Sequence, residues 1–241
     1  MSQSRDELTS IISDGARGLE IPLSPNAILS FQKYYELLET RGRSVNLTTV
    51  VGASDVARLH FLDSMALLNV VSFVDTKVID IGSGAGFPGV PLKITEQTID
   101  LTLLDSSGKR ISFLSELCEA IGLNASCIQA RAEEFAHEAV NRENFNIAVS
   151  RAVARLNVLS ELCLPFVRIG GVFIAMKSVD SDAELSEACR AIETLGGELD
   201  KCIDYTIPDT EITHRVVVIK KVSNTPPKYP RRFARIQKSP L

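Results

Sequence analysis

A carboxylate followed by closely spaced glycines forms the stretch of this chain that is most able to bind a ligand. Asp80 lies near the end of an apolar, β-branched run, as a buried parallel strand requires. Four glycines then fall within eight residues, namely Gly82, Gly84, Gly86 and Gly89. Glycine at this density costs conformational entropy, so it usually marks backbone that turns tightly or touches a ligand. Pro88 and Pro91 fit the first turn of a helix, so we expect a strand, a glycine loop and a helix start.

The glycines allow two alternative binding motifs. In the first, Asp80 stands at the strand tip and glycine occupies every second position from Gly82 to Gly86, the usual layout for binding S-adenosylmethionine. In the second, the stretch from Gly84 to Gly89 formally matches a dinucleotide fingerprint, which is weak evidence in isolation. Its first glycine comes late after the strand, and Pro88 interrupts it. A nucleotide-like ligand is expected in either case, and a purely structural tight turn is the alternative.

Further polar residues follow the next expected strands. Asp105 comes 23 residues after Gly82, where a carboxylate can accept hydrogen bonds from both ribose hydroxyls of an adenosine. Glu133 follows the third strand and could receive an adenine amino group, and Arg151 follows the fourth, at a tip that faces cofactor and substrate. Each acid also has a structural alternative, since Asp105 could cap the next turn and Glu133 could complement a helix dipole.

These residues need a framework of alternating strands and helices, and the hydrophobic pattern from residue 77 onward supplies one. Strands are expected at 78–81, 99–105, 125–130, 145–150 and 171–176, with helices at 109–120, 132–140, 154–164 and 182–195. The last two strands, 202–207 and 215–222, leave no room for a helix between them, so they should pair antiparallel. The sequence therefore predicts an α/β protein with a doubly wound, Rossmann-like, seven-stranded sheet that ends in an antiparallel strand.

Helices precede this framework. Ser24 and Pro25 match an N-cap and a first-turn proline, and a second amphipathic helix is expected over 55–70. In that helix His60 and Asp63 lie three residues apart on one face, so they could hydrogen-bond each other. We expect three regions: an N-terminal helical cap packed on the core (1–74), an S-adenosylmethionine-binding α/β core that carries the glycine loop (75–223) and a basic C-terminal tail (224–241).

The charge of the chain is divided unevenly. Its net charge is −4, but residues 215–241 contain eight lysines and arginines and no acidic residue. An acidic body with a basic tail suggests a face for a polyanion, and a disordered, solvated end is the alternative. Tyr229 and Phe233 among the basic side chains could stack on unpaired bases. The RNA-binding candidates are Arg131, Lys228, Arg231, Arg232, Arg235 and Lys238. No cofactor contact is expected in the tail.

Composition narrows the class of protein. The five cysteines are widely scattered without a CxxC pair, which indicates a reduced, cytoplasmic chain and argues against a metal site. No segment reaches the ~18–20 apolar residues of a membrane span, and the N-terminus lacks a signal-peptide pattern. We expect a cytoplasmic monomer that binds no membrane.

Taken together, the motifs resemble the RsmG family, bacterial small-subunit rRNA guanine-N7 methyltransferases formerly called glucose-inhibited division protein B. The glycine loop with its Phe-Pro-Gly extension and the Ser150–Ala152 tripeptide are the most specific of these motifs. The resemblance spans residues 46–219 and rests on Asn46–Thr48, His60, Asp63, Asp80–Leu92, Leu104–Ser106, Lys109, Arg110, Arg131–Phe135, Ser150–Ala152, Lys177 and His214–Ile219.

The resemblance implies methylation of N7 of a guanine in the decoding-region loop of 16S rRNA in the small ribosomal subunit, with S-adenosylmethionine as cofactor and S-adenosylhomocysteine as product. With the glycine loop, it implies cofactor contacts at Asp80, Gly82, Gly84, Gly86, Phe87, Asp105, Ser106, Ser107, Ala132, Glu133 and Arg151. It also favours Asn46, His60 and Asp63 as residues that position the substrate.

Guanine N7 has an in-plane lone pair and no proton, so its methylation needs no general base. Catalysis should then come from alignment of N7 with the methyl group and sulfur. Lys177 could donate a hydrogen bond to guanine O6 or contact a phosphate, with a structural role equally open. The alternatives are an NAD-type oxidoreductase, using the Gly84–Gly89 motif, and a non-catalytic rRNA-binding assembly factor.

Overall fold

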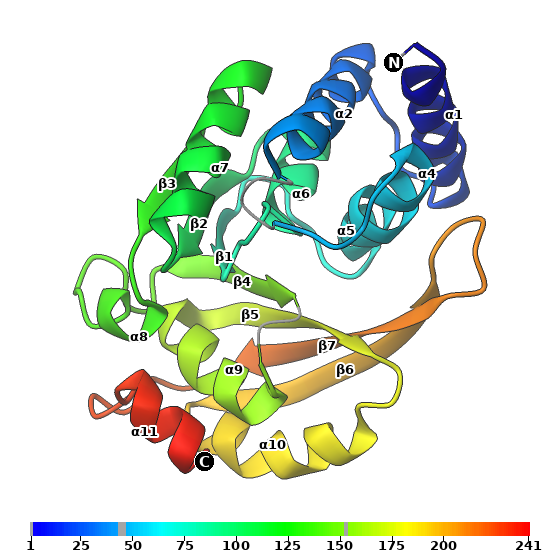
Figure 1. Ribbon diagram of the computed structural model, residues 1–241. Helices are drawn as coiled ribbons and strands as arrows, with labels where there is room; N and C mark the ends of the chain where they lie inside the picture. The colour runs from blue at the N-terminus through cyan, green and yellow to red at the C-terminus, as the bar shows by residue number, and fades with distance from the viewer. Residues whose placement is uncertain (1, 43–46, 152–153) are drawn as a thin grey trace.

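A mixed sheet of seven strands forms the middle layer of the protein (Figure 1). The computed structural model describes residues 2–42, 47–151 and 154–241. In chain order the strands are β1 (Lys77–Ile81), β2 (Asp100–Asp105), β3 (Ala125–Gln129), β4 (Phe145–Arg151), β5 (Val167–Ser178), β6 (Gly197–Thr206) and β7 (Thr213–Lys221). Their order in the sheet is β3-β2-β1-β4-β5-β7-β6, and β7 runs antiparallel to both neighbours. This confirms the predicted doubly wound α/β sheet with a final antiparallel strand.

Successive residues of the central strands point to opposite faces of the sheet, so each face has its own core. In β1, Val78 packs into one core and Ile79 into the other. The first core includes the N-terminal helices with α6 (Gly89–Thr95) and α7 (Gly108–Ile121). The second core is covered by α9 (Leu156–Cys163), α10 (Asp182–Thr194) and α11 (Phe233–Lys238), as Figure 1 shows. The short turn η4 (Leu164–Phe166) also contributes side chains to it.

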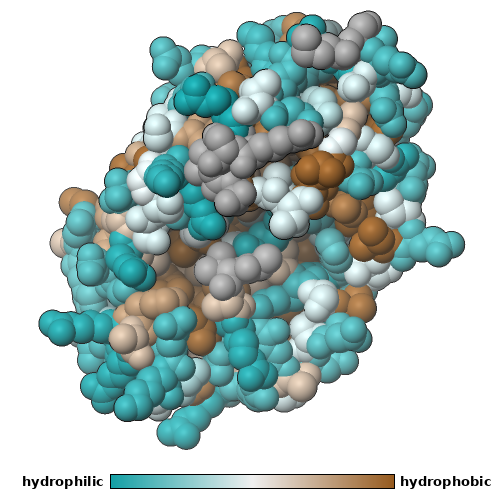
Figure 2. Space-filling model, viewed as in Figure 1, coloured by the Kyte–Doolittle hydropathy of each residue, from teal (hydrophilic) through white to brown (hydrophobic). Residues whose placement is uncertain are grey.

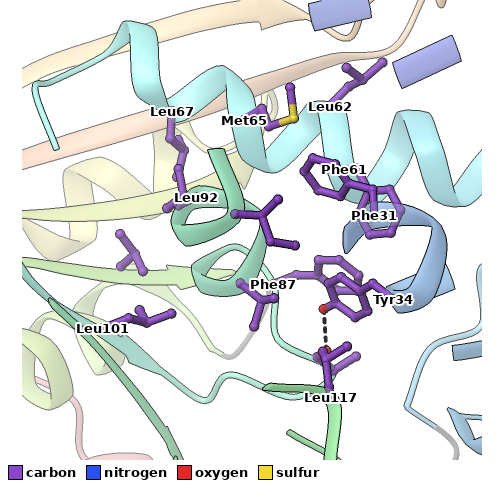
Figure 3. Close-up of a cluster of buried hydrophobic side chains, with 14 of the residues drawn as sticks. Phe31, Tyr34, Phe61, Leu62, Met65, Leu67, Phe87, Leu92, Leu101 and Leu117 are labelled. Carbon is purple, nitrogen blue, oxygen red and sulfur yellow. Dashed lines mark hydrogen bonds between the residues drawn. The ribbon is translucent and has the colours of Figure 1, made fainter. Parts of the chain in front are cut away.

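The N-terminal helices share the first core with the sheet. They are α1 (Ser2–Gly18), α2 (Pro25–Leu37), η1 (Leu38–Gly42), α4 (Ala53–Val56), η2 (Ala57–Leu62), α5 (Asp63–Met65) and η3 (Ala66–Asn69). The predicted N-cap is confirmed, because the Ser24 hydroxyl accepts a hydrogen bond from the Ala27 amide at 3.1 Å. Phe31, Tyr34 and Phe61 of these helices gather around Phe87 of the glycine loop (Figure 3). The loop therefore rests on side chains from the N-terminal helices.

Two predicted helices differ from the structure, and the alternative left open for the C-terminal tail is decided. The helix expected over 55–70 is interrupted by the π-helical turn η2 and ends in the 3-10 turn η3. The helix expected over 132–140 stops after one turn, as α8 (Ala132–Phe135). There the Asn141 side chain donates to the Phe135 carbonyl at 3.3 Å, satisfying an oxygen that the helix leaves free. The C-terminal segment contains α11 and the buried side chains Tyr229 and Ile236, so it is structured rather than a solvated end.

Candidate active site

A pocket of about 450 Å³ lies at the carboxyl ends of β1, β2 and β4. Ligands of doubly wound sheets bind at this edge, and the volume is in the range of cofactor sites. The face seen in Figure 2 is mostly hydrophilic and is hollowed near the centre of the view. Eight predicted cofactor contacts line the pocket: Gly82, Gly84, Phe87, Asp105, Ser106, Ala132, Glu133 and Arg151. His60 and Arg131 also line it.

The glycine loop follows the carboxyl end of β1 and leaves open space on the side of the pocket. Gly82 and Gly84 have φ angles of +73° and +59°, which L side chains rarely adopt. A Cβ built on Gly84 would meet only the Gly82 carbonyl, at 3.8 Å. At Gly86 the same atom would lie 2.6 Å from the Tyr34 hydroxyl, inside the aromatic cluster. The described loop therefore opens to the pocket at Gly82 and Gly84, and it closes against protein at Gly86, the third glycine of the first motif.

Asp80 supports this loop from beneath and does not line the pocket. Its carboxylate is buried and accepts a hydrogen bond from the Gly89 amide at 2.8 Å, while Oδ1 has no partner among the described atoms. Burial raises the pKa of Asp80 from 3.8 to about 7, opposed in part by the Gly89 amide. Two other predicted contacts, Gly86 and Ser107, are also absent from the described lining. These three residues shape the loop and the adjacent turn.

Asp105 reaches the pocket from the end of β2. Its carboxylate accepts hydrogen bonds from the amides of Gly84 at 3.0 Å and Ser107 at 2.8 Å, and Arg110 lies 3.3 Å away. These bonds fix the carboxylate against the loop and leave acceptor capacity for hydroxyl donors in the pocket. Arg110 belongs to one of the sequence motifs, but nothing in its spacing predicts the pairing with Asp105. Ala132 and Glu133 form the neighbouring wall, at the start of α8.

The sequence suggests a hydrogen bond between His60 and Asp63, but the structure shows none. Among the described side chains, Arg151 contacts both residues and joins them. The Arg151 guanidinium donates to Asp63 Oδ2 at 3.2 Å, and it lies 3.1 Å from His60 Nδ1. An unprotonated Nδ1 accepts from Arg151, whereas a protonated Nδ1 donates to the Leu59 carbonyl oxygen, 3.0 Å away. The other ring nitrogen, Nε2, lies 2.7 Å from the Thr48 hydroxyl, which can donate to it or accept from it. The spacing along one helix was right, but the bridge comes from β4.

Asp63 is the centre of a wider network. Its side chain is 1% exposed, and Oδ1 accepts hydrogen bonds from the Tyr205 hydroxyl at 2.6 Å and from His214 Nδ1 at 2.8 Å. The bond to Asp63 raises the pKa of His214 above its usual 6.5. Burial, and then the charge of Arg151, lowers the pKa of His60 to about 4. At neutral pH His60 is therefore uncharged, and it lies next to an arginine whose charge Asp63 balances.

An aromatic stack holds these groups over the glycine loop. The His60 ring lies 4.3 Å from the Phe87 ring, and the Arg151 guanidinium lies 4.9 Å from the same centroid. Phe87 stacks in turn on Tyr34 at 5.2 Å, and the Tyr34 hydroxyl donates to the Ala85 carbonyl at 2.6 Å. His60, Arg151 and the glycine loop thus share one aromatic support.

The remaining predicted residues lie elsewhere. Lys177 binds Glu184 at 2.5 Å and the Ala154 carbonyl at 2.6 Å, away from the described lining, which favours its structural alternative. Arg231 is occupied by Glu161 in an ion pair of 2.6 Å. Asn46 lies outside the described residues. The basic residues of the tail do not line this pocket where it is described, namely Lys228, Arg231, Arg232, Arg235 and Lys238.

Several residues of the site were missed or given another role. Phe233 lines the pocket, although the sequence had suggested only base stacking on RNA. Thr48 and His214 belong to quoted motifs, but nothing in their spacing showed that they meet His60 and Asp63. Tyr205 carried no signal in the sequence. No group of three metal-ligating side chains occurs in the described parts of the chain, and none of the helices there is long and apolar enough to cross a membrane.

Comparison with known proteins gives consistent matches over nearly the whole chain. A sequence model of the family GidB, described as rRNA small subunit methyltransferase G, matches residues 27–213. The protein named ribosomal RNA small subunit methyltransferase G from Alkaliphilus oremlandii is 45% identical over 98% of this chain and 99% of its own length. The protein of that name from Desulforamulus reducens is 42% identical over the same shares.

Solved structures resemble the fold. A chain of the complex between the Haloferax volcanii Trm112 methyltransferase activator and a methyltransferase superposes with a TM-score of 0.55. It is 12% identical and the match covers 78% of this chain and 98% of that one. The ribosomal protein L11 methylase of Lactobacillus delbrueckii gives a TM-score of 0.50 at 14% identity, over 67% of this chain and 77% of that one.

Proposed function

The chain belongs to the rRNA small subunit methyltransferase G family, and from this membership we propose that it methylates N7 of a guanine in the decoding-region loop of 16S rRNA. The cofactor would be S-adenosylmethionine. The observation that carries the proposal is a single pocket in which the open glycine loop and Asp105 meet His60 and Arg151. A cofactor side and a substrate side adjoin there, as group transfer between two bound molecules requires.

The residues of the pocket fit this cofactor. The absence of a side chain at Gly84 leaves open space in the pocket. This space can accept the methionine part of S-adenosylmethionine. Asp105 offers carboxylate oxygens to the ribose hydroxyls, and Glu133 offers an acceptor for the adenine amino group. When bound, S-adenosylmethionine supplies a methyl group on a positively charged sulfur.

The chain's own residues then position the base rather than move a proton. N7 attacks through a lone pair, so no general base is needed, and His60 with a pKa of about 4 is neutral at physiological pH. Asp63 and Phe87 hold the Arg151 guanidinium at the pocket, where its donors can orient the base. Methyl transfer leaves positive charge on the guanine, which the positive charge of Arg151 would repel. The Asp63 carboxylate reduces this repulsion, because it offsets the charge of Arg151.

We also propose the small ribosomal subunit, or its precursor, as the substrate of a monomeric, cytoplasmic enzyme. Arg131 at the pocket is the first candidate for an RNA contact. Lys228, Arg232, Arg235 and Lys238 remain candidates on the C-terminal segment. Arg231 is not retained, because its guanidinium pairs with a buried carboxylate. The division of the chain at residues 74 and 223 remains a proposal.

The test is transfer of a labelled methyl group from S-adenosylmethionine to unmodified small subunits. Label should appear in the RNA with the wild-type protein and be absent with Gly84→Val, whose side chain would occupy the open space above the loop. A wild-type chain that binds the cofactor and the subunit but transfers no label would support a non-catalytic assembly factor. A chain that binds NAD in place of S-adenosylmethionine would support an oxidoreductase.

A further inference from the structure

The C-terminal segment, residues 224–238, lies against one end of the pocket. Phe233, at the start of α11, lines the pocket together with Ala130, Ala132 and Glu133, which follow β3. The guanidinium of Arg131 lies 5.7 Å from the centroid of the Phe233 ring. The tail therefore supplies an aromatic side chain at the β3 end of the pocket. His60 and Arg151 lie at the opposite end, because β4, which carries Arg151, is on the other side of β1 in the order β3-β2-β1-β4.

We propose that Phe233 forms a wall of the adenine subsite, so that cofactor affinity depends on the docked C-terminal segment. The proposal rests on S-adenosylmethionine as the ligand. Asp105 at the end of β2 takes the ribose, and the base then lies toward the end of β3, beside Phe233. An aromatic face is suited to a purine, because stacking on a base is favourable whatever its hydrogen-bonding edge.

The segment is anchored by a buried ion pair. Glu161 of α9 is 0% exposed, and Arg231 satisfies it with three bonds: from the backbone amide at 2.8 Å, from Nε at 2.8 Å and from Nη2 at 2.6 Å. Undocking the segment would break all three of these charge-assisted bonds at once. This pair therefore fixes the chain two residues before Phe233.

Contacts from the loop after α8 reinforce this anchor. The Arg142 guanidinium donates to the carbonyls of Tyr229 at 2.9 Å and Thr225 at 2.8 Å. His137 Nε2 lies 2.8 Å from the Pro230 carbonyl, and Ile236 is fully buried in the second core. Because these bonds are made to backbone carbonyls, they fix the path of the main chain whatever side chains it carries. The position of Phe233 is thus set by structure on both sides of it.

This placement changes what truncation of the tail should do. The sequence had placed no cofactor contact beyond residue 223, so removal of the tail was expected to affect RNA alone. The family model matches residues 27–213 and does not reach the segment. With Phe233 in the pocket, loss of the segment removes a cofactor contact as well as basic residues. Reduced methylation by a truncated chain would therefore have two causes, which cofactor binding separates.

The test is calorimetric titration of the full-length chain with S-adenosylhomocysteine, which binds without being consumed. Phe233→Ala should weaken binding about tenfold, within the range of alanine substitutions at base-stacking aromatics. Phe233→Tyr should stay within about threefold of wild type, because it keeps the ring. The matched control is Gln237→Ala, an exposed residue one turn later on α11 that does not line the pocket.

A second variant tests the anchor. Glu161→Gln keeps the size of the side chain but removes the charge that holds Arg231, and it should weaken binding and expose the segment to trypsin after Lys228. If Phe233→Ala binds as tightly as Gln237→Ala with an unchanged melting temperature, the adenine-wall proposal is overturned. If the wild type itself does not bind S-adenosylhomocysteine, the proposed function fails instead, so the two failures are distinct.

Discussion

Replacement of Asp63 by asparagine tests whether this residue holds the site together. The carboxylate is 1% exposed and serves three donors: Arg151 at 3.2 Å, Tyr205 at 2.6 Å and His214 at 2.8 Å. Asparagine keeps the shape but leaves the Arg151 side chain, 16% exposed, without its counter-ion. Breaking a buried pair in this way costs about 3–5 kcal/mol, and partial exposure of Arg151 places the expected loss near the lower figure. We expect Asp63→Asn to lower the free energy of unfolding by about 3 kcal/mol.

The pH dependence of that loss identifies its origin. Asp63 raises the pKa of His214, so the pair stabilises the fold fully below pH 6.5, and the contribution disappears as pH rises through the elevated folded-state pKa. Urea denaturation should therefore show a larger difference between wild type and variant at pH 6 than at pH 9. Asp200→Asn, an exposed carboxylate on the same strand as Tyr205, is the matched control and should change little.

The functional readout of the same variant is methyl transfer at saturating cofactor. Because Asp63 orients Arg151, we expect turnover to fall by much more than the affinity for S-adenosylhomocysteine. A variant with wild-type stability at both pH values, or with wild-type turnover, would refute the reasoning that Asp63 is the centre of the network.

Three further predictions concern single residues. Asp105→Ala removes charge-assisted hydrogen bonds worth roughly 1.5–3 kcal/mol each, so calorimetry should show a ten- to hundred-fold loss of S-adenosylhomocysteine affinity, and unchanged affinity would contradict the ribose assignment. Gly84→Val, at a φ of +59° and facing open space, should stay folded by circular dichroism yet lose cofactor binding; normal binding would mean that the loop does not touch the ligand. His60 has a pKa lowered from 6.5 to about 4, so the unfolded state binds a proton between these pH values more readily than the folded state does. The contribution of His60 to the free energy of unfolding should therefore fall by about 3 kcal/mol as pH drops from 7 to 4. His60→Gln should reduce that slope in urea titrations, and an unchanged slope would assign it to other groups.

The sheet could be predicted because its strands carry their own signals. Val78, Ile79 and Ile81 form a β-branched run, and the glycines after it stop the strand at the ligand-binding edge. Asp105 and Glu133 follow from the same logic, since parallel strands end together at one edge of the sheet. The part of the pocket built by Asp105, Glu133 and the glycine loop therefore depends mainly on local pattern and topology.

The network around His60 depends on long-range pairing that spacing does not reveal. His60 and Asp63 could be placed on one helix face, but Arg151, which joins them, lies on a strand about ninety residues later. Arg231 looked like an RNA contact because its charge stands in a basic run. Its partner Glu161 is seventy residues away and fully buried. Charge in a sequence does not say which side chains remain free.

The most direct measurement for the proposed function is mass mapping of RNA nucleosides after unmodified small subunits react with the chain and S-adenosylmethionine. The expected result is one new 7-methylguanosine, located in the decoding-region loop of 16S rRNA, and its loss with Asp63→Asn. Methylation at another atom of guanine, at another base, or on ribosomal protein rather than RNA would contradict the assignment of N7 as the nucleophile.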